Sequence, residues 1–163
     1  MKTVLVLRHA KSDWGNSSLA DFDRPLNKRG RAAAPVMGAL LRTEQLVPDL
    51  IITSAAKRAR KTAKLAAAAC GYEGDIMEAP DLYLAGAQAY IQQLRSAPET
   101  AHRVMVVGHN PDVEELIRLL TGRQERMPTA ALAQIDCRIA TWRTLSSTCE
   151  AELVNLWRPR DLA

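Results

Sequence analysis

Short runs of aliphatic residues recur along the chain and alternate with helix-like stretches, and this alternation limits the folds open to it. Thr3–Leu7 (TVLVL), Asp49–Thr53 (DLIIT) and Arg103–Val107 (RVMVV) are almost continuously apolar, a pattern typical of strands buried on both faces of a parallel sheet. A weaker strand is expected near Asp75–Glu78. Two late segments, 131–138 and 150–157, are expected to add further strands.

The stretches between these strands carry helical spacing and helix boundary signals. Asn27 is suited to cap a helix that runs to about Thr43. Gly71 is expected to end an alanine-rich helix, and Pro111 is expected at the first helical position of another. Four helices are therefore predicted, over about 27–43, 57–69, 87–95 and 111–120.

Strand and helix in alternation predict an α/β fold with a mostly parallel sheet covered by helices on both sides. With 163 residues, of which 47% are hydrophobic, the chain can bury one sizeable core. No repeat, low-complexity tract or linker divides it, so we expect a single domain over residues 1–163.

Charge, cysteine content and apolar run lengths argue against several classes of protein. The formal net charge is only +4 and no long Lys/Arg block occurs, so we expect no nucleic-acid partner. Cys70, Cys137 and Cys149 lack metal-ligand spacing and are interpreted as reduced. The apolar run Val4–Leu7 is too short for a secretory signal, and no run approaches membrane-spanning length. A cytoplasmic protein without membrane contact is expected.

Cationic side chains follow several of the predicted strands. Arg8 and His9 end the first strand, Arg58 lies in the first helical turn after the second strand, and His109 ends the RVMVV strand. Ligands of open α/β sheets bind beyond the carboxyl ends of the strands, so these residues should share one pocket. We expect no carboxylate among them, and such a cluster is favourable only when an anion binds there. A phosphoryl group, which suits bidentate guanidinium donors, is the predicted ligand.

The two histidines are predicted to have different roles at this pocket. His9, held between Arg8 and Arg58, should be kept neutral by their positive field and is the candidate nucleophile. His109 would donate a hydrogen bond to the phosphoryl oxygens. His102, in a polar loop, is interpreted as a surface residue. The cations near Arg58 are also interpreted as solvated, namely Lys57, Arg60, Lys61 and Lys64.

Three ordered motifs resemble the histidine phosphatase superfamily. LRHAKS carries its Arg-His triplet at His9, TSAAKRARKTA is similar to its second motif and maps the phosphate-binding arginine to Arg58, and VVGHNPD supplies His109. Length and the RHAKS form place the chain nearest the SixA-type phosphohistidine phosphatases. The resemblance implies a phosphoglycerate mutase-like three-layer α/β/α sandwich and transient phosphorylation of His9. It also implies phosphoryl binding by Arg8, Arg58 and His109, with no metal or cofactor required.

One feature of larger relatives is missing from this sequence. Many ester phosphatases carry an acid that protonates the leaving alkoxide, yet the motif around Glu78 and Asp81 is absent here. Phosphohistidine needs no such acid, because imidazole is a good leaving group near neutral pH. We therefore expect a phosphatase acting on protein phosphohistidine. One alternative is a broad small-molecule phosphomonoesterase, with Asp81 as its candidate acid and a phosphorylated metabolite as its substrate. The other is a non-catalytic phosphate-binding module. The sequence leaves the oligomeric state open.

Overall fold

The computed structural model describes residues 1–162 and contains a six-stranded sheet in the order β3-β2-β4-β1-β5-β6. The strands β3, β2, β4 and β1 are mutually parallel, whereas β5 runs antiparallel to both β1 and β6. The expected mostly parallel sheet is therefore confirmed. The strand bounds are β1 Lys2–Arg8, β2 Leu50–Ser54, β3 Ile76–Ala79, β4 Arg103–Gly108, β5 Leu132–Cys137 and β6 Ala151–Trp157.

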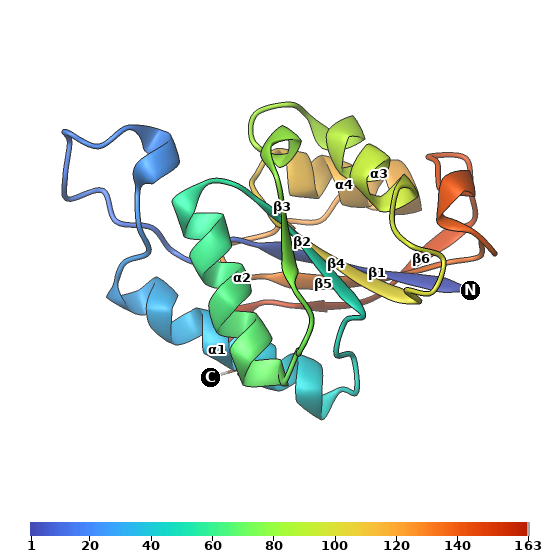
Figure 1. The fold of residues 1–163 in the computed structure, drawn as a ribbon, viewed down its shortest axis with the longest axis horizontal. Helices are drawn as coiled ribbons and strands as arrows, with labels where there is room; N and C mark the ends of the chain where they lie inside the picture. Colours follow the sequence, from blue (N-terminus) through green and yellow to red (C-terminus); the bar gives the residue numbers. More distant parts are fainter. Residues whose placement is uncertain (163) are drawn as a thin grey trace.

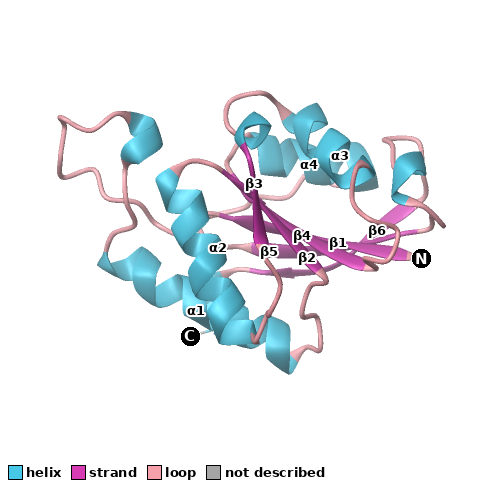
Figure 2. Ribbon diagram, in the orientation of Figure 1, coloured by secondary structure: helices cyan, strands magenta, loops and turns pink. Residues whose placement is uncertain are grey.

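The α-helices of the described residues cover both faces of this sheet (Figures 1 and 2). They are α1 Lys28–Thr43, α2 Lys57–Cys70, α3 Ala87–Arg95 and α4 Asp112–Thr121. The first two pack side by side on one face, and α3 and α4 lie on the other. This is the three-layer α/β/α arrangement predicted from the sequence.

The side chains of β1 point alternately to the two faces of the sheet, and each face has its own core. Val4 and Val6 point into the cluster beneath α3 and α4, while Leu5 and Leu7 point into the cluster beneath α1 and α2. All four side chains are fully buried. Since β1 lies in the middle of the sheet, the residues that follow it emerge between the two helical layers.

The helix boundary signals were largely right. The side chain of Asn27 caps α1 by accepting from the backbone N–H of Gly30 at 2.8 Å, and Gly71 ends α2 with a left-handed φ of 80°. Pro111 was placed one residue too far into its helix. It is the N-cap, because its carbonyl accepts the bond from the Glu115 N–H while its own backbone precedes the first helical residue, Asp112.

Turns of 3-10 helix connect several of these elements. They are Asp21–Asp23, Pro80–Leu82 and Trp142–Thr144, and a further 3-10 turn, Pro159–Leu162, follows β6. Among residues 1–162, no helix is both long enough and apolar enough to cross a membrane.

Candidate active site

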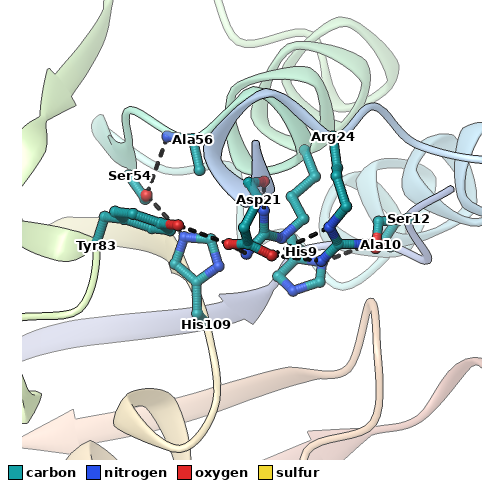
Figure 3. Close-up of polar contacts among 10 residues, drawn as sticks. His9, Ala10, Ser12, Asp21, Arg24, Ser54, Ala56, Tyr83 and His109 are labelled. Carbon is teal, nitrogen blue, oxygen red and sulfur yellow. Dashed lines mark hydrogen bonds and ion pairs between the residues drawn. The ribbon is translucent and has the colours of Figure 1, made fainter. Parts of the chain in front are cut away.

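Three neighbouring strands bring the predicted site residues to one edge of the sheet. β4 lies between β1 and β2, so His9 after β1 and His109 after β4 come together, with Ser54 at the end of β2 beside them. The ring centroids of His9 and His109 are 5.1 Å apart. Figure 3 shows the two side chains close together at this edge. The predicted convergence of these chain segments is confirmed.

A small cavity of about 250 Å³ opens at this edge. All four residues singled out from the sequence line it, together with residues of the loop that follows β1 and of two other loops. The lining residues are Arg8, His9, Lys11, Ser12, Trp14, Arg24, Arg58, His109, Asn110 and Thr129.

His9 is buried and rigidly held. Its backbone N–H donates to the Gly108 carbonyl at 2.9 Å, and its own carbonyl accepts from Ala130 N–H at 3.0 Å. The ring Nδ1 lies 2.7 Å from the carbonyl oxygen of Ala10. A carbonyl can only accept, so the proton of the neutral ring resides on Nδ1 and leaves Nε2 with a free lone pair.

Burial lowers the pKa of His9 to about 3, with smaller contributions from His109, Arg8 and Arg58. The ring is therefore neutral near pH 7, as expected. The expected cause was only partly right, because loss of solvent, more than the arginine field, disfavours the imidazolium.

His109 faces His9 from the end of β4. Its Nε2 lies 2.8 Å from Ser54 Oγ, and its backbone N–H donates to the hydroxyl of Tyr90 at 3.1 Å. Burial, followed by the charge of Arg58, lowers its pKa to about 4. Its Nδ1 is buried and has no hydrogen-bond partner within residues 1–162.

The arginines divide into those inside the cavity and those outside it. Arg58 is 6% exposed and lines the cavity, whereas Arg60 is exposed and lies 3.8 Å from Glu78 in an ion pair. Arg8 donates to the Met127 carbonyl at 3.1 Å. The Nε atoms of Arg8 and Arg58 are buried without a partner in the described chain. The sequence motif was mapped to Arg58 rather than Arg60, and of these two arginines Arg58 is the one that lines the cavity.

The expectation that no carboxylate accompanies these cations was wrong. Asp21, in the turn between β1 and α1, contacts Arg58 Nη2 and Arg24 Nη2, each at 3.0 Å. The Tyr83 hydroxyl donates to Asp21 Oδ2 at 2.6 Å (Figure 3). This hydrogen bond and the two arginines lower the pKa of Asp21 to about 2. The carboxylate neutralises part of the cationic charge when the cavity holds no anion.

The sequence interpretation also missed a third arginine. Arg24 is 7% exposed and lines the cavity, where its Nη1 donates to Ser12 Oγ at 2.6 Å and its guanidinium lies 3.4 Å from the Trp14 ring centroid. Its segment, DFDRPLNKRG, suggested no role for this side chain. An arginine between a turn and a proline has no periodic pattern that would indicate burial.

Other candidates lie outside the cavity. Asp81 is exposed on the 3-10 turn before Tyr83, and Glu78 pairs with Arg60. His102 is exposed, as expected for a surface residue. In the part of the chain that the structure describes, no three His, Cys, Asp or Glu side chains are grouped so that they could hold a metal ion.

Comparison with known proteins identifies the family. The model of the histidine phosphatase superfamily (branch 1) matches residues 4–83, from β1 to Tyr83. The solved structure of a protein assigned as the phosphohistidine phosphatase SixA from Agrobacterium tumefaciens is 30% identical with a TM-score of 0.83, over 97% of this chain and 98% of that one. This chain belongs to the histidine phosphatase superfamily. It is a phosphatase.

Two further relatives extend this result. The structure of the protein histidine phosphatase SixA complexed with tungstate has the same fold, with a TM-score of 0.84 at 20% identity over 99% of both chains. An uncharacterized chloroplastic protein of Arabidopsis thaliana is 31% identical over 150 residues, which cover 86% of this chain and 69% of that protein. The fold of this phosphatase is thus shared with members that carry the SixA name.

Proposed function

We propose that this histidine phosphatase hydrolyses protein phosphohistidine through a phosphorylated His9 and needs no metal ion. The observation that carries the nucleophile assignment is the geometry of His9. Its Nδ1 is engaged by the Ala10 carbonyl, and burial keeps the ring neutral. Nε2 therefore presents a lone pair to the cavity in which the cations gather.

Arginines supply the positive charge that phosphoryl transfer requires. Arg8, Arg24 and Arg58 line the cavity around His9, and their N–H groups match the oxygens of a phosphoryl group. His109 adds a neutral donor. Ser54 Oγ accepts from the Ala56 N–H and can donate its own proton to His109 Nε2. The ring proton of His109 then lies on Nδ1, the buried nitrogen that lacks a partner in the described chain. These donors would stabilise charge on the oxygens in the transition state.

The reaction proceeds in two steps, phosphoryl transfer to His9 and hydrolysis of the phosphoenzyme. His9 Nε2 attacks phosphorus and the P–N bond of the substrate breaks. The leaving imidazole, protonated beforehand on its second ring nitrogen, departs as a neutral molecule. Water then attacks the phosphorus of phospho-His9, which releases inorganic phosphate and regenerates the free imidazole.

The carboxylates favour a P–N substrate over an alkyl ester. An alkoxide leaving group must be protonated, but Asp21, the carboxylate that contacts Arg24 and Arg58, has a pKa of about 2 and is ionised near pH 7. Neither Glu78 nor Asp81 lines the cavity. An acid-independent leaving group such as imidazole therefore fits the site better than an alkoxide.

The test compares turnover of a phosphohistidine-bearing protein domain with that of sugar and aryl phosphates in buffer containing a metal chelator. Wild type should cleave the phosphohistidine fastest, and His9→Ala should lose activity by several orders of magnitude because the phosphoenzyme cannot form. His102→Ala, which removes an exposed histidine, should match wild type.

Each part of the proposal can fail separately. Equal activity of wild type and His9→Ala would refute the nucleophile. Preference for an alkyl phosphate would replace the phosphohistidine substrate by a small metabolite and require an acid. Dependence of turnover on an added metal ion would refute the metal-free mechanism.

A further inference from the structure

A second hollow of about 380 Å³ lies beside the active site, and its chemistry differs from that of the catalytic cavity. Five cations line it. Four come from one exposed stripe of α2, and Arg31 comes from α1. The α2 cations are Lys57, Arg60, Lys61 and Lys64, which are spaced so that they share one face of the helix.

The charge of this groove is poorly compensated. Among its lining residues the sole carboxylate is Glu78, which contacts Arg60 at 3.8 Å. No carboxylate within residues 1–162 makes an ion pair with Lys57, Lys61 or Lys64. Cations packed this closely repel one another and favour an anionic occupant.

The groove also borders the catalytic cavity. Lys57 precedes the cavity residue Arg58, and Pro25, on the groove wall, follows the cavity residue Arg24. From Lys57 to Lys64 the stripe extends for about 10 Å along α2, at 1.5 Å per helical residue. A molecule whose phosphoryl group enters the cavity must therefore be considerably larger than a phosphate if it is also to contact the whole stripe.

We propose that this groove docks an acidic segment of the phosphorylated protein substrate. The inference rests on the proposed function, since it identifies the partner whose phosphohistidine enters the cavity. Carboxylates of that segment would pair with the α2 cations. Its aliphatic side chains would cover the apolar part of the groove, formed by Pro25, Leu26 and Ile76.

Nucleic acid fits the same groove less well. Proteins that bind single strands combine cations with aromatic side chains on which bases stack, and no aromatic residue lines this hollow. Glu78 would also repel a phosphate backbone placed next to Arg60. An acidic protein segment needs no stacking surface.

Matched charge variants test the docking surface. K57Q/K61Q/K64Q removes three cations from the stripe, and R42Q/R138Q/R143Q removes three exposed cations that lie outside both hollows. The measured quantity is the ratio of kcat/KM for a phosphohistidine-bearing acidic domain to kcat/KM for an aryl phosphate. At low salt this ratio should fall about tenfold in the stripe variant and stay at the wild-type value in the control.

Salt and direct binding supply independent readouts. In about 1 M salt, where the screening length is about 3 Å, the difference between stripe variant and wild type should vanish. A fluorescent polyglutamate peptide should bind wild type and the control variant, and bind K57Q/K61Q/K64Q several-fold more weakly. The docking proposal would be overturned if the kcat/KM ratio fell equally in both variants. It would also be overturned if the ratio fell in neither variant.

The peptide-binding measurement tests the docking proposal independently of the proposed function. If wild type cleaves aryl phosphate but not protein phosphohistidine, the proposed function fails, and peptide binding still decides whether the stripe holds an acidic segment. Tighter binding of a single-stranded oligonucleotide than of polyglutamate, lost in the stripe variant, would assign the groove to nucleic acid and overturn the proposal.

Discussion

Asp21 shows how a single loop residue adjusts the charge of the whole site. Its carboxylate contacts two cavity arginines, and its backbone carbonyl accepts from Arg58 Nη1 at 2.7 Å. A phosphoryl group that binds Arg58 competes with this side chain for the same donors. Because Asp21 is 46% exposed, water screens the competition and keeps its energy small.

We therefore predict that Asp21→Asn binds inorganic phosphate more tightly than wild type does. The amide keeps the shape and one acceptor but removes the negative charge that opposes the anion. An exposed pair of this kind contributes about 1 kcal/mol or less, so the inhibition constant of phosphate should fall by up to about fivefold near pH 7. Competitive inhibition of aryl phosphate turnover measures it.

The exposed Asp23, two residues away, provides the control. Asp23→Asn removes the same charge from the same turn without removing a contact to Arg58, and it should leave the phosphate inhibition constant near the wild-type value. Weaker phosphate binding by Asp21→Asn would mean that Asp21 acts chiefly by positioning Arg58.

At the scale of elements, α1 supports the catalytic loop through a close backbone approach. A Cβ placed on Gly30, in the first turn of α1, would lie 2.1 Å from the carbonyl oxygen of Lys11. That same carbonyl accepts from Asn27 N–H at 2.9 Å. Only glycine lets the start of α1 touch the chain two residues after His9.

Gly30→Ala should therefore reduce kcat, because the methyl group displaces Lys11 and with it the backbone that holds His9. Gly38→Ala is the matched control, since its Cβ would clash with the Ala66 carbonyl at 2.3 Å in the α1–α2 contact, away from the cavity. Overpacking should destabilise both variants by about 1–3 kcal/mol. Urea unfolding measures the stability of each variant. The kcat value, measured well below the unfolding transition, then shows which of the two variants has a disturbed active site. Equal kcat in both would refute the link from α1 to His9.

The elements themselves were predictable because local patterns encode them. The aliphatic runs around Val4 and Val106 and the caps at Asn27 and Gly71 fix boundaries to within one or two residues. The loop between β1 and α1 was not predictable in this way. Arg24 and Asp21 reach the site through irregular backbone, and their burial and pairing depend on contacts with Ser12 and Tyr83 that no periodicity in the sequence reveals.

At the scale of the whole molecule, the order of the strands determines which residues meet. Placing His9 and His109 together required only that their strands be neighbours in a parallel sheet, and this could be expected from the sequence. The antiparallel pairing of β5 with β1 could not be expected from the sequence, because strand order depends on the packing of residues far apart in the chain. The outcome is a central strand whose end is covered on both sides, and both histidines are buried at 6% exposure.

This burial should make the stability of the protein depend on pH. The pKa falls from the ordinary value of 6.5 to about 3 for His9 and about 4 for His109. Below pH 6.5 the unfolded chain binds protons that the folded protein does not, so stability decreases as the pH falls from 6.5 toward 4. The pKa of Asp21 is lowered from 3.8 to about 2, so its own contribution is lost only at lower pH.

Between about pH 7 and about pH 5, two such histidines should lower the free energy of unfolding by roughly 3–4 kcal/mol, since each contributes up to about 1.4 kcal/mol per pH unit below its ordinary pKa of 6.5. Urea unfolding at both pH values measures this loss. His9→Gln/His109→Gln carries no titrating ring at the site and should lose much less stability over the same interval, with each single variant in between. An equal loss in wild type and the double variant would place the titrating groups elsewhere and contradict the burial of two neutral imidazoles at the end of β1 and β4.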